Sequence, residues 1–136
     1  MQSVQEHITI PADRTRLAEI RSAVRALCKH HGVSPKTTRR IVLAIDEAVA
    51  NVMEHSGASA DSRIDVLVDL GPSVIVASIR DRGRRFDPTG LRKTLPDACR
   101  RTRGFGLHLI RLVTDHMEYQ RTDDGTNVLT LRVESR

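Results

Sequence analysis

A carboxylate and an amide lie one helical turn apart in the segment DEAVANVMEHS. Glu47, Asn51 and His55 recur every fourth residue, so on a helix they share one line along the surface. A carboxylate in such a row suits a general base, and an amide oxygen suits a hard cation such as Mg²⁺. Taken alone, the row is also typical of a solvated polar helix face. Ala44 and Ala48 beside it make the surface small as well as polar, which favours a binding site.

Two further segments carry groups that suit a phosphate-bearing ligand. In DRGRRFDP, Asp81 ends an apolar run and Gly83 follows two residues later, so a ligand can approach the backbone closely. In RGFGLHLI, Gly104 and Gly106 precede a helical pattern, and the free N–H groups of a helix N-terminus bind anions. For each segment alone, a strand-ending turn or a glycine-containing loop is an equally simple interpretation. Neither the G-x-G-x-x-G fingerprint nor a P-loop is present.

Hydrophobic spacing predicts the elements that must position these groups. It predicts helices near 17–31, 35–55 and 107–117 and strands near 7–10, 63–70, 74–79, 117–120 and 127–133. Asp13 and Ser34 are predicted N-caps, and Gly32 is a predicted helix stop. This order of elements predicts an α+β fold, a two-layer α/β sandwich with the helices on one face of a mixed, mainly antiparallel sheet.

The helix predicted at 35–55 separates its apolar and polar residues. Val42, Ile45, Val49 and Val52 cluster within about a quarter-turn at helical spacing. The polar row lies across from this stripe. We therefore expect the stripe to anchor the helix on the core and the polar row to face a ligand.

Length and composition indicate one domain, residues 1–136, with an aliphatic core. Aromatic residues make up only 2% and Trp is absent, which argues against a stacking platform for single-stranded nucleic acid. No apolar run approaches the roughly 20 residues that span a bilayer, and no signal peptide is visible. Cys28 and Cys99 match no metal spacing and are expected to be reduced thiols of a cytoplasmic protein.

The excess positive charge is concentrated in one segment. Residues 84–103 hold seven Lys or Arg and two Asp, an excess equal to the net charge of +5 of the whole chain. Pro88, Gly90 and Pro96 within it predict a loop. A DNA-binding surface usually carries its basic residues along a helix or a face. Charge alone leaves open a site for a local anion, such as a nucleotide phosphate, and a solvated basic loop.

Taken together and in this order, the three segments resemble the sequence boxes of the GHKL nucleotide-binding superfamily. Within it, the chain is most similar to the small anti-sigma-factor serine kinases of bacterial partner-switching systems. LAIDEAVANVMEH matches the first box, DRGRRFDP the second and RGFGLHLIRLVTD the third, and DGTNVLTL resembles the closing strand pair. The resemblance covers nearly the whole chain and implies the Bergerat ATP-binding fold, with ATP and Mg²⁺ as ligands.

The resemblance also implies roles for individual residues. Glu47 matches the general base, and Asn51 matches the Mg²⁺ ligand that ties the metal to the triphosphate. Asp81 matches the carboxylate that accepts a hydrogen bond from the adenine amino group, Gly83 the glycine beneath the base, and Thr126 a hydroxyl near the adenine. The lid over the phosphates is matched by Arg103, Gly104, Gly106 and Leu107.

One position departs from the pattern of the second box, which usually runs D-x-G-x-G. Arg85 stands at the place of the second glycine. Since arginine tolerates a positive φ poorly, we expect a changed or strained turn there, with weakened or retuned nucleotide binding.

The resemblance implies an ATP-dependent serine kinase that binds a sigma factor and phosphorylates an anti-sigma-factor antagonist. It also implies a homodimer. From composition and charge placement we expect a cytoplasmic protein without direct nucleic-acid or membrane contact. A non-catalytic, nucleotide-gated binding protein of the same fold is the alternative, and Arg85 favours it. A histidine-kinase fragment would need a dimerisation helix with a phospho-acceptor His, for which we expect 136 residues to leave no room. Confinement of the excess charge to one loop disfavours a basic nucleic-acid binder.

Overall fold

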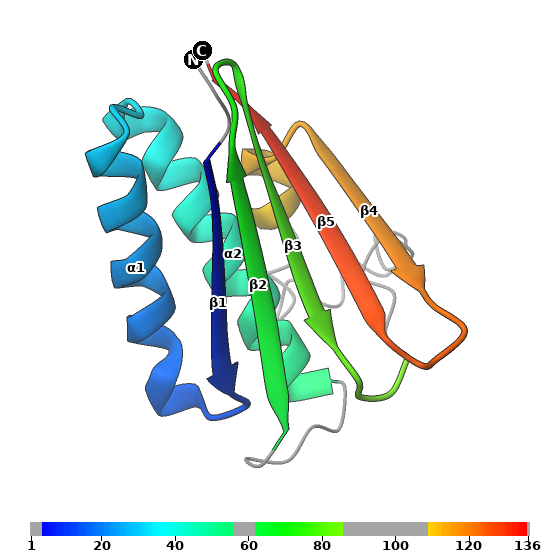
Figure 1. Ribbon diagram of the computed structural model, residues 1–136. Coiled ribbons are helices and arrows are strands. Elements are labelled where there is room, and N and C mark those ends of the chain that lie inside the picture. Colours follow the sequence, from blue (N-terminus) through cyan, green and yellow to red (C-terminus); the bar gives the residue numbers. More distant parts are fainter. Residues whose placement is uncertain (1–3, 56–61, 86–108, 136) are drawn as a thin grey trace.

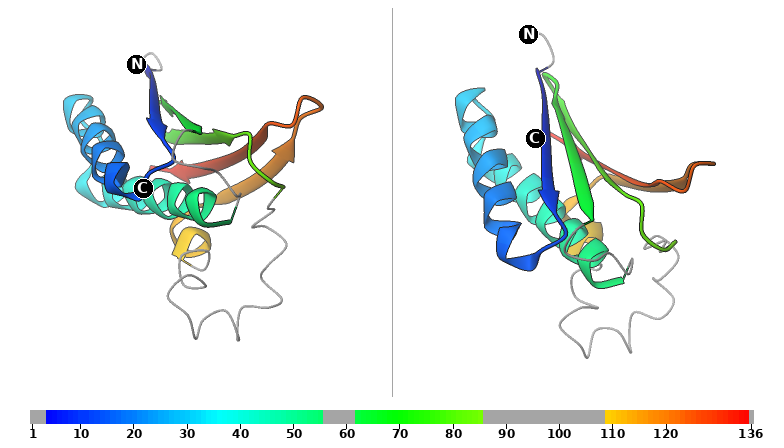
Figure 2. Two further views of the ribbon diagram at one scale, coloured as in Figure 1. Left: turned by 90° about the horizontal axis from the view of Figure 1, so that it is seen from below. Right: turned by 60° about the horizontal axis from the view of Figure 1, so that its bottom comes forward.

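The computed structural model describes residues 4–55, 62–85 and 109–135. Its elements are β1 (Val4–Pro11), the short 3₁₀ helix η1 (Arg14–Arg16), α1 (Leu17–His30), α2 (Pro35–His55), β2 (Arg63–Leu70), β3 (Val74–Asp81), β4 (His116–Arg121) and β5 (Asn127–Glu134). The strands form one sheet in the order β1-β2-β3-β5-β4 (Figure 1). Helices α1 and α2 lie against one face, and no described helix covers the other (Figure 2). The predicted two-layer α+β fold is confirmed, and every pairing among the described strands is antiparallel.

Alternating side chains explain the strands. In β2 every second residue, from Ile64 to Leu70, is buried, and the residues between them point to the helix-free face. The turn into β3 is closed by the N–H of Gly71, which donates to the carbonyl of Val74 at 2.9 Å, and the predicted hairpin is confirmed. Strand β1 lies at the predicted edge of the sheet. It is longer than the predicted 7–10 because it pairs along the full length of β2.

Local capping determines where the helices begin and end. Asp13 accepts the N–H two residues further on at 3.0 Å and caps η1. Gly32 adopts a φ of +74°, which favours glycine, directly after α1. The hydroxyl of Ser34 accepts the N–H of Thr37 at 3.2 Å, and α2 then runs over Pro35–His55 as predicted. None of the described helices combines the length and the apolar character that crossing a membrane requires.

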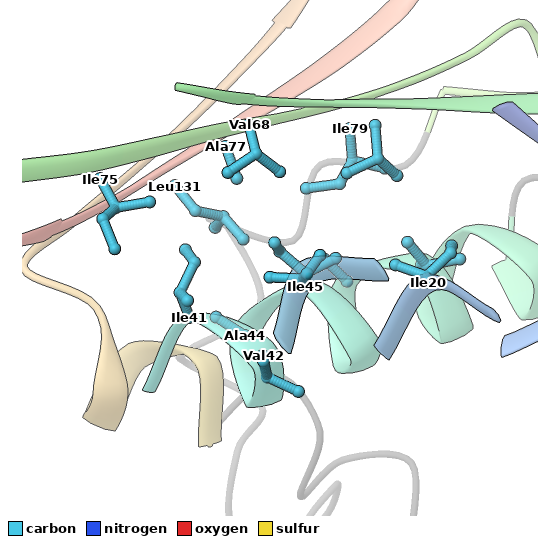
Figure 3. Packing of buried hydrophobic residues seen from close by; sticks show 14 of the residues in the cluster. Ile20, Ile41, Val42, Ala44, Ile45, Val68, Ile75, Ala77, Ile79 and Leu131 are labelled. Carbon is cyan, nitrogen blue, oxygen red and sulfur yellow. The ribbon is translucent and has the colours of Figure 1, made fainter. Parts of the chain in front are cut away.

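The core lies between the two helices and the sheet. Ile45 of α2 and Ile20 of α1 point toward Ile79 and Val68 of the sheet (Figure 3), and all four side chains are 1% exposed or less. The buried apolar residues of α2 are Ile41, Val42, Ala44, Ile45, Ala48 and Val49. Val52, which was predicted for this stripe, is only half-buried. The small alanines beside the polar row therefore belong to the core, so α2 is buried over more of its circumference than the stripe predicted.

The last helix is described over residues 109–113 and ends before the predicted residue 117. The hydroxyl of Thr114 donates to the carbonyl four residues earlier at 2.7 Å. The N–H of Asp115 donates to a carbonyl of β5 at 2.8 Å, which turns the chain into the sheet. Met117 consequently lies in β4.

Arg40 of α2 ties this helix end to the sheet. Its guanidinium donates to the carbonyl of Val113 at 3.1 Å, the carbonyl of Glu134 at 2.8 Å and the carboxylate of Asp115 at 2.9 Å. Asp115 also accepts the N–H of Glu134 at 2.6 Å. Because the side chains of Arg40 and Asp115 are each 15% exposed, water screens this pair weakly, and it joins α2, residues 109–113 and β5 at one point.

Replacing Ile45 with alanine tests the packing of α2. The side chain is 1% exposed and its truncation leaves a cavity, so we expect the free energy of unfolding to fall by about 2–5 kcal/mol. Leu112→Ala is the matched control because Leu112 is 66% exposed, and it should change that free energy by less than about 0.5 kcal/mol. Urea denaturation followed by circular dichroism measures both variants, and equal effects would contradict the described core.

Candidate functional site

Three of the residues predicted to act together, Glu47, Asn51 and Asp81, lie on elements that run toward one end of the sheet. Strand β3 and helix α2 both run toward this end, β5 begins there, and η1 lies there before α1 (Figure 1). Glu47 and Asn51 occupy the second half of α2, and Asp81 is the last residue of β3. The fold thus brings three predicted site residues from distant parts of the sequence to the same end of the molecule.

Glu47 is half-buried and receives no hydrogen bond from the described residues. Burial raises the pKa of its carboxyl, the neighbouring Asp46 carboxylate raises it further, and Arg14 acts in the opposite direction. Asp46 itself accepts from Arg21 of α1 at 2.8 Å. A carboxylate with a raised pKa takes up a proton more readily than an ordinary glutamate does, which suits a general base.

Asn51 follows one turn later and is only 7% exposed. Its Nδ2 is buried and has no hydrogen-bond partner among the described residues. A buried amide left in this state costs about 1–3 kcal/mol, so a ligand group is the expected partner. Among residues 4–55, 62–85 and 109–135, no three His, Cys, Asp or Glu side chains gather as a metal site. Because an amide N–H donates, a ligand acceptor such as a phosphate oxygen fits Nδ2. The amide oxygen of the same side chain is the atom that suits a Mg²⁺ ion held mainly by phosphates and water, which is the usual mode for this ion.

Asp81 has one carboxylate oxygen engaged and the other available. The residue is 6% exposed, and its Oδ1 accepts the N–H of Gly83 at 2.8 Å and the amide of Asn127 at 3.1 Å. Its Oδ2 receives no hydrogen bond from the described residues. A buried carboxylate oxygen of this kind is an acceptor for an N–H group of a ligand.

Sequence reasoning missed Asn127. The antiparallel register places it directly opposite Asp81, and it is 4% exposed. The sequence pattern could have predicted its burial. Asn127 occupies the same alternating positions as the buried residues Leu129, Leu131 and Val133 of β5. An amide in a core-facing strand position requires hydrogen-bond partners.

Thr126, predicted to lie near the adenine, lines a pocket on the other face of the sheet. Its N–H donates to the hydroxyl of Thr122 at 3.2 Å, and its own hydroxyl accepts from Arg82 at 3.4 Å. The pocket, of about 500 Å³, is lined by Ser62, Arg63, Asp65, Arg80, Asp81, Arg82 and Thr126. Because strand side chains alternate, Arg63 and Asp65 of β2 and Arg80 of β3 place it on the helix-free face. The structure does not bring Thr126 together with Glu47 and Asn51.

Arg85 occupies the place of the motif's second glycine without backbone strain. No non-glycine residue in the described part of the chain has a positive φ, so Arg85 does not adopt the conformation that arginine tolerates poorly. The guanidinium carbon lies 5.4 Å from the centroid of the Tyr119 ring, within the range of a cation–π contact. A side-chain contact therefore supports the turn at this position.

The predicted lid lies outside the described residues. This applies to Arg103, Gly104, Gly106 and Leu107. It also applies to most of the basic segment 84–103, of which only the first two residues are described. The lid stays a prediction from the sequence.

His55, the third member of the polar row, has its Nε2 3.8 Å from the carboxylate of Glu54.

The chain is similar in fold to solved structures, three of which are from Mycobacterium tuberculosis, Pseudomonas aeruginosa and Acinetobacter baumannii. The RsbU and RsbW domains of Rv1364c from Mycobacterium tuberculosis match with a TM-score of 0.71 and 23% identity over 98% of this chain, which spans only 33% of that chain. A chain of the SiaB–SiaC complex from Pseudomonas aeruginosa matches with a TM-score of 0.66 and 16% identity, covering 95% of this chain and 89% of the other. The Acinetobacter baumannii histidine kinase AdeS matches with a TM-score of 0.52 and 10% identity, covering 96% and 68%. At these identities the likeness establishes the fold alone.

None of the curated proteins compared with the chain matches it. A protein family described as the histidine kinase-like ATPase domain matches residues 10–133. That match contains Glu47, Asn51 and Asp81, the three residues that the fold gathers at one end of the sheet. It spans nearly the whole chain and agrees with the likeness to solved structures. The chain therefore belongs to the family of histidine kinase-like ATPase domains.

Proposed function

We propose that the chain is an ATP-dependent protein-serine kinase that binds a sigma factor and phosphorylates an anti-sigma-factor antagonist on serine. The observation that carries the proposal is the pair on α2. The carboxylate of Glu47 has a raised pKa, and the buried amide of Asn51 lies one turn away without a partner among the described residues. Family membership supports ATP as the phosphoryl donor. The likeness to a chain of the SiaB–SiaC complex supports a protein as the other substrate.

The nucleotide base is proposed to lie against the end of β3. Asp81 Oδ2, which no described residue engages, would accept a hydrogen bond from the 6-amino group of adenine. Gly83 carries no side chain and leaves room beneath the base. The predicted lid residues Arg103, Gly104, Gly106 and Leu107 would close over the phosphates. Thr126 is proposed with them as a hydroxyl near the adenine, although its described contacts lie on the helix-free face.

In the proposed transfer step, the serine oxygen of the partner attacks the γ-phosphorus. The new oxygen–phosphorus bond forms while the bond to the β–γ bridging oxygen breaks, and ADP leaves. Glu47 accepts the proton of the serine hydroxyl, and help of this kind is typically worth roughly 10²- to 10⁴-fold in rate. Burial of Glu47 assists because it raises the pKa of the carboxyl and so strengthens the base.

Asn51 would hold Mg²⁺, which when bound neutralises charge across the phosphates. The amide oxygen of Asn51 would be the metal ligand, while its unpartnered Nδ2 would donate to a phosphate oxygen of the same nucleotide. The sigma factor and the homodimer are carried by the sequence resemblance alone, and the cytoplasmic location by the sequence composition. All three belong to the proposal.

Removing the carboxylate of Glu47 separates ATP binding from phosphoryl transfer. Glu47→Ala should retain ATP but lower phosphotransfer by roughly 10²- to 10⁴-fold. The assay uses γ-labelled ATP and a candidate antagonist, a small single-domain protein with an acceptor serine encoded beside the gene. Glu118→Ala, which removes an exposed carboxylate from β4, is the control. Unchanged transfer in Glu47→Ala would rule out the base role, and ATP binding without any transfer by the unaltered chain would favour the nucleotide-gated binding protein.

Asn51→Leu should weaken binding while strengthening the fold. The substitution replaces an unpartnered buried amide by an apolar side chain of similar size, so the free energy of unfolding should rise by about 1 kcal/mol. Calorimetric titration should show that the Mg²⁺-dependent part of ATP affinity is lost. A variant that is less stable, or that binds Mg²⁺ and ATP like the unaltered chain, would contradict the role assigned to Asn51.

Arg14→Ala should move the acid limb of the pH–rate profile to higher pH. Arg14 lowers the pKa of Glu47, so its removal leaves that pKa raised further. Glu47 must be ionised to accept a proton, and the rate is lost as the pH falls through its pKa. Arg25→Ala, at an exposed arginine of α1, should leave the limb in place. High salt should shrink the shift because exposed charges are screened, and an unmoved limb at low salt would refute the coupling.

A further inference from the structure

The amide nitrogen of Asn127 holds the turn that follows β3. Its Nδ2 lies 3.1 Å from each of three acceptors, which are Asp81 Oδ1 and the carbonyls of Gly83 and Arg84. Two amide hydrogens are thus shared among three oxygens that lie within the four-residue segment 81–84. Because Asn127 is 4% exposed, water competes poorly for these hydrogen bonds.

The amide oxygen of Asn127 is held in turn by β4. It accepts from the hydroxyl of Tyr119 at 2.5 Å and from the guanidinium of Arg121 at 2.9 Å. The same Arg121 nitrogen donates to the carbonyl of Gly83 at 3.1 Å. All polar atoms of the Asn127 side chain are therefore engaged within the protein, so this amide is suited to position the turn and not to contact a ligand itself.

These contacts determine which oxygen of Asp81 stays available. Asn127 and the N–H of Gly83 both donate to Oδ1, which fixes the plane of the carboxylate and leaves Oδ2 without a described donor. A fixed acceptor oxygen discriminates sharply between a ligand that offers a donor and one that offers an acceptor at the same place. Without the Asn127 amide, the carboxylate could rotate about its last bond and lose this discrimination.

Arg85 adds a second contact between the turn and the β4–β5 hairpin. Its guanidinium lies over the ring of Tyr119, the residue whose hydroxyl holds Asn127. Arg85 does not adopt a positive φ, so backbone freedom is not what shapes the turn here. The side chain in the place of the motif's second glycine thus anchors the turn to β4.

We infer that Asn127 is a positioning residue which, held by Tyr119 and Arg121, presents Asp81 Oδ2 to the 6-amino group of a purine nucleotide, and that Arg85 secures the same turn by stacking on Tyr119. The inference deepens the proposed function and rests on its assignment of an adenine nucleotide to this end of the sheet. It assigns base selectivity to the β4–β5 hairpin as well as to the carboxylate itself.

Inosine triphosphate is the diagnostic ligand because it differs from ATP by a 6-oxo group in place of the 6-amino group. Calorimetric titration of the whole chain with each nucleotide, at constant Mg²⁺, gives the ratio of the two affinities. The unaltered chain should prefer ATP. Asn127→Ala should lower the ATP affinity about tenfold to a hundredfold and the inosine triphosphate affinity less than about threefold. Gln120→Ala, which removes an exposed amide from β4, should leave both affinities unchanged.

Further variants, at Tyr119, Asp81 and Arg85, keep the inference testable if Asn127→Ala folds poorly. Tyr119→Phe keeps the ring beneath Arg85 but removes the hydroxyl that holds Asn127, so it should reduce the ratio by a smaller factor. Asp81→Ala should remove the preference for ATP, so that the two nucleotides bind with similar affinity. Adding Asn127→Ala to Asp81→Ala should cause no additional loss of ATP affinity, because Asn127 acts through Asp81. Arg85→Ala should also lower the ratio. If Arg85 bound phosphate instead, the same substitution would weaken the binding of both nucleotides equally.

The outcomes separate this inference from the proposed function. Equal weakening of both nucleotides in Asn127→Ala and Tyr119→Phe would indicate a purely structural role and overturn the inference. The inference would also be overturned if the ratio of ATP affinity to inosine triphosphate affinity in both variants stayed at the value of the unaltered chain while ATP still bound. If the unaltered chain binds neither nucleotide at millimolar concentration, the proposed function and the inference fall together.

Discussion

The burial of α2 is the constraint on which the candidate site depends. Ile41, Ile45 and Val49 lie on the core side of this helix and are 1% exposed or less. Because burying them fixes the rotation of the helix about its axis, the directions of positions 47 and 51 cannot change independently of the core. The same packing leaves the Asn51 amide buried without a described partner, at a cost of about 1–3 kcal/mol that the surrounding apolar contacts offset. An unsatisfied group held in this way is typical of a site that is shaped before its ligand arrives.

The two layers of the fold contribute different groups to the same end of the molecule. The helix layer supplies Glu47 and Asn51, and the sheet supplies Asp81 at the point where β3 ends. The register of β5 then determines how Asp81 is held, because it places Asn127 opposite that carboxylate. Arg40 joins the layers at a separate point. Its guanidinium donates to the carbonyl of Val113 and to the carbonyl of Glu134 in β5.

Arg85 illustrates that a turn can be fixed in two ways. A glycine permits backbone conformations that other residues avoid, and that freedom is the usual reason for its presence in a ligand-binding turn. Here the turn adopts no positive φ at position 85, and the arginine side chain instead lies over the ring of Tyr119. Cation–π contacts are worth about 0.5–2 kcal/mol, so the stack can replace part of what local backbone geometry provides elsewhere. The departure from the motif is therefore accompanied by a compensating contact in the next hairpin.

The sequence by itself determined what depends on local spacing. Helical periodicity and capping residues predicted α2, alternation predicted the β2–β3 hairpin, and the ordered motifs predicted the family. The roles of Glu47, Asn51 and Asp81 stay predictions from the same motifs. Tertiary structure alone decided the length of β1, the early end of the helix at 109–113, and the partnership of Asn127 with Asp81. Local spacing reports which side of an element is buried. Which residues face each other depends on strand order and register, and these are set by hydrogen bonds between segments far apart in the chain.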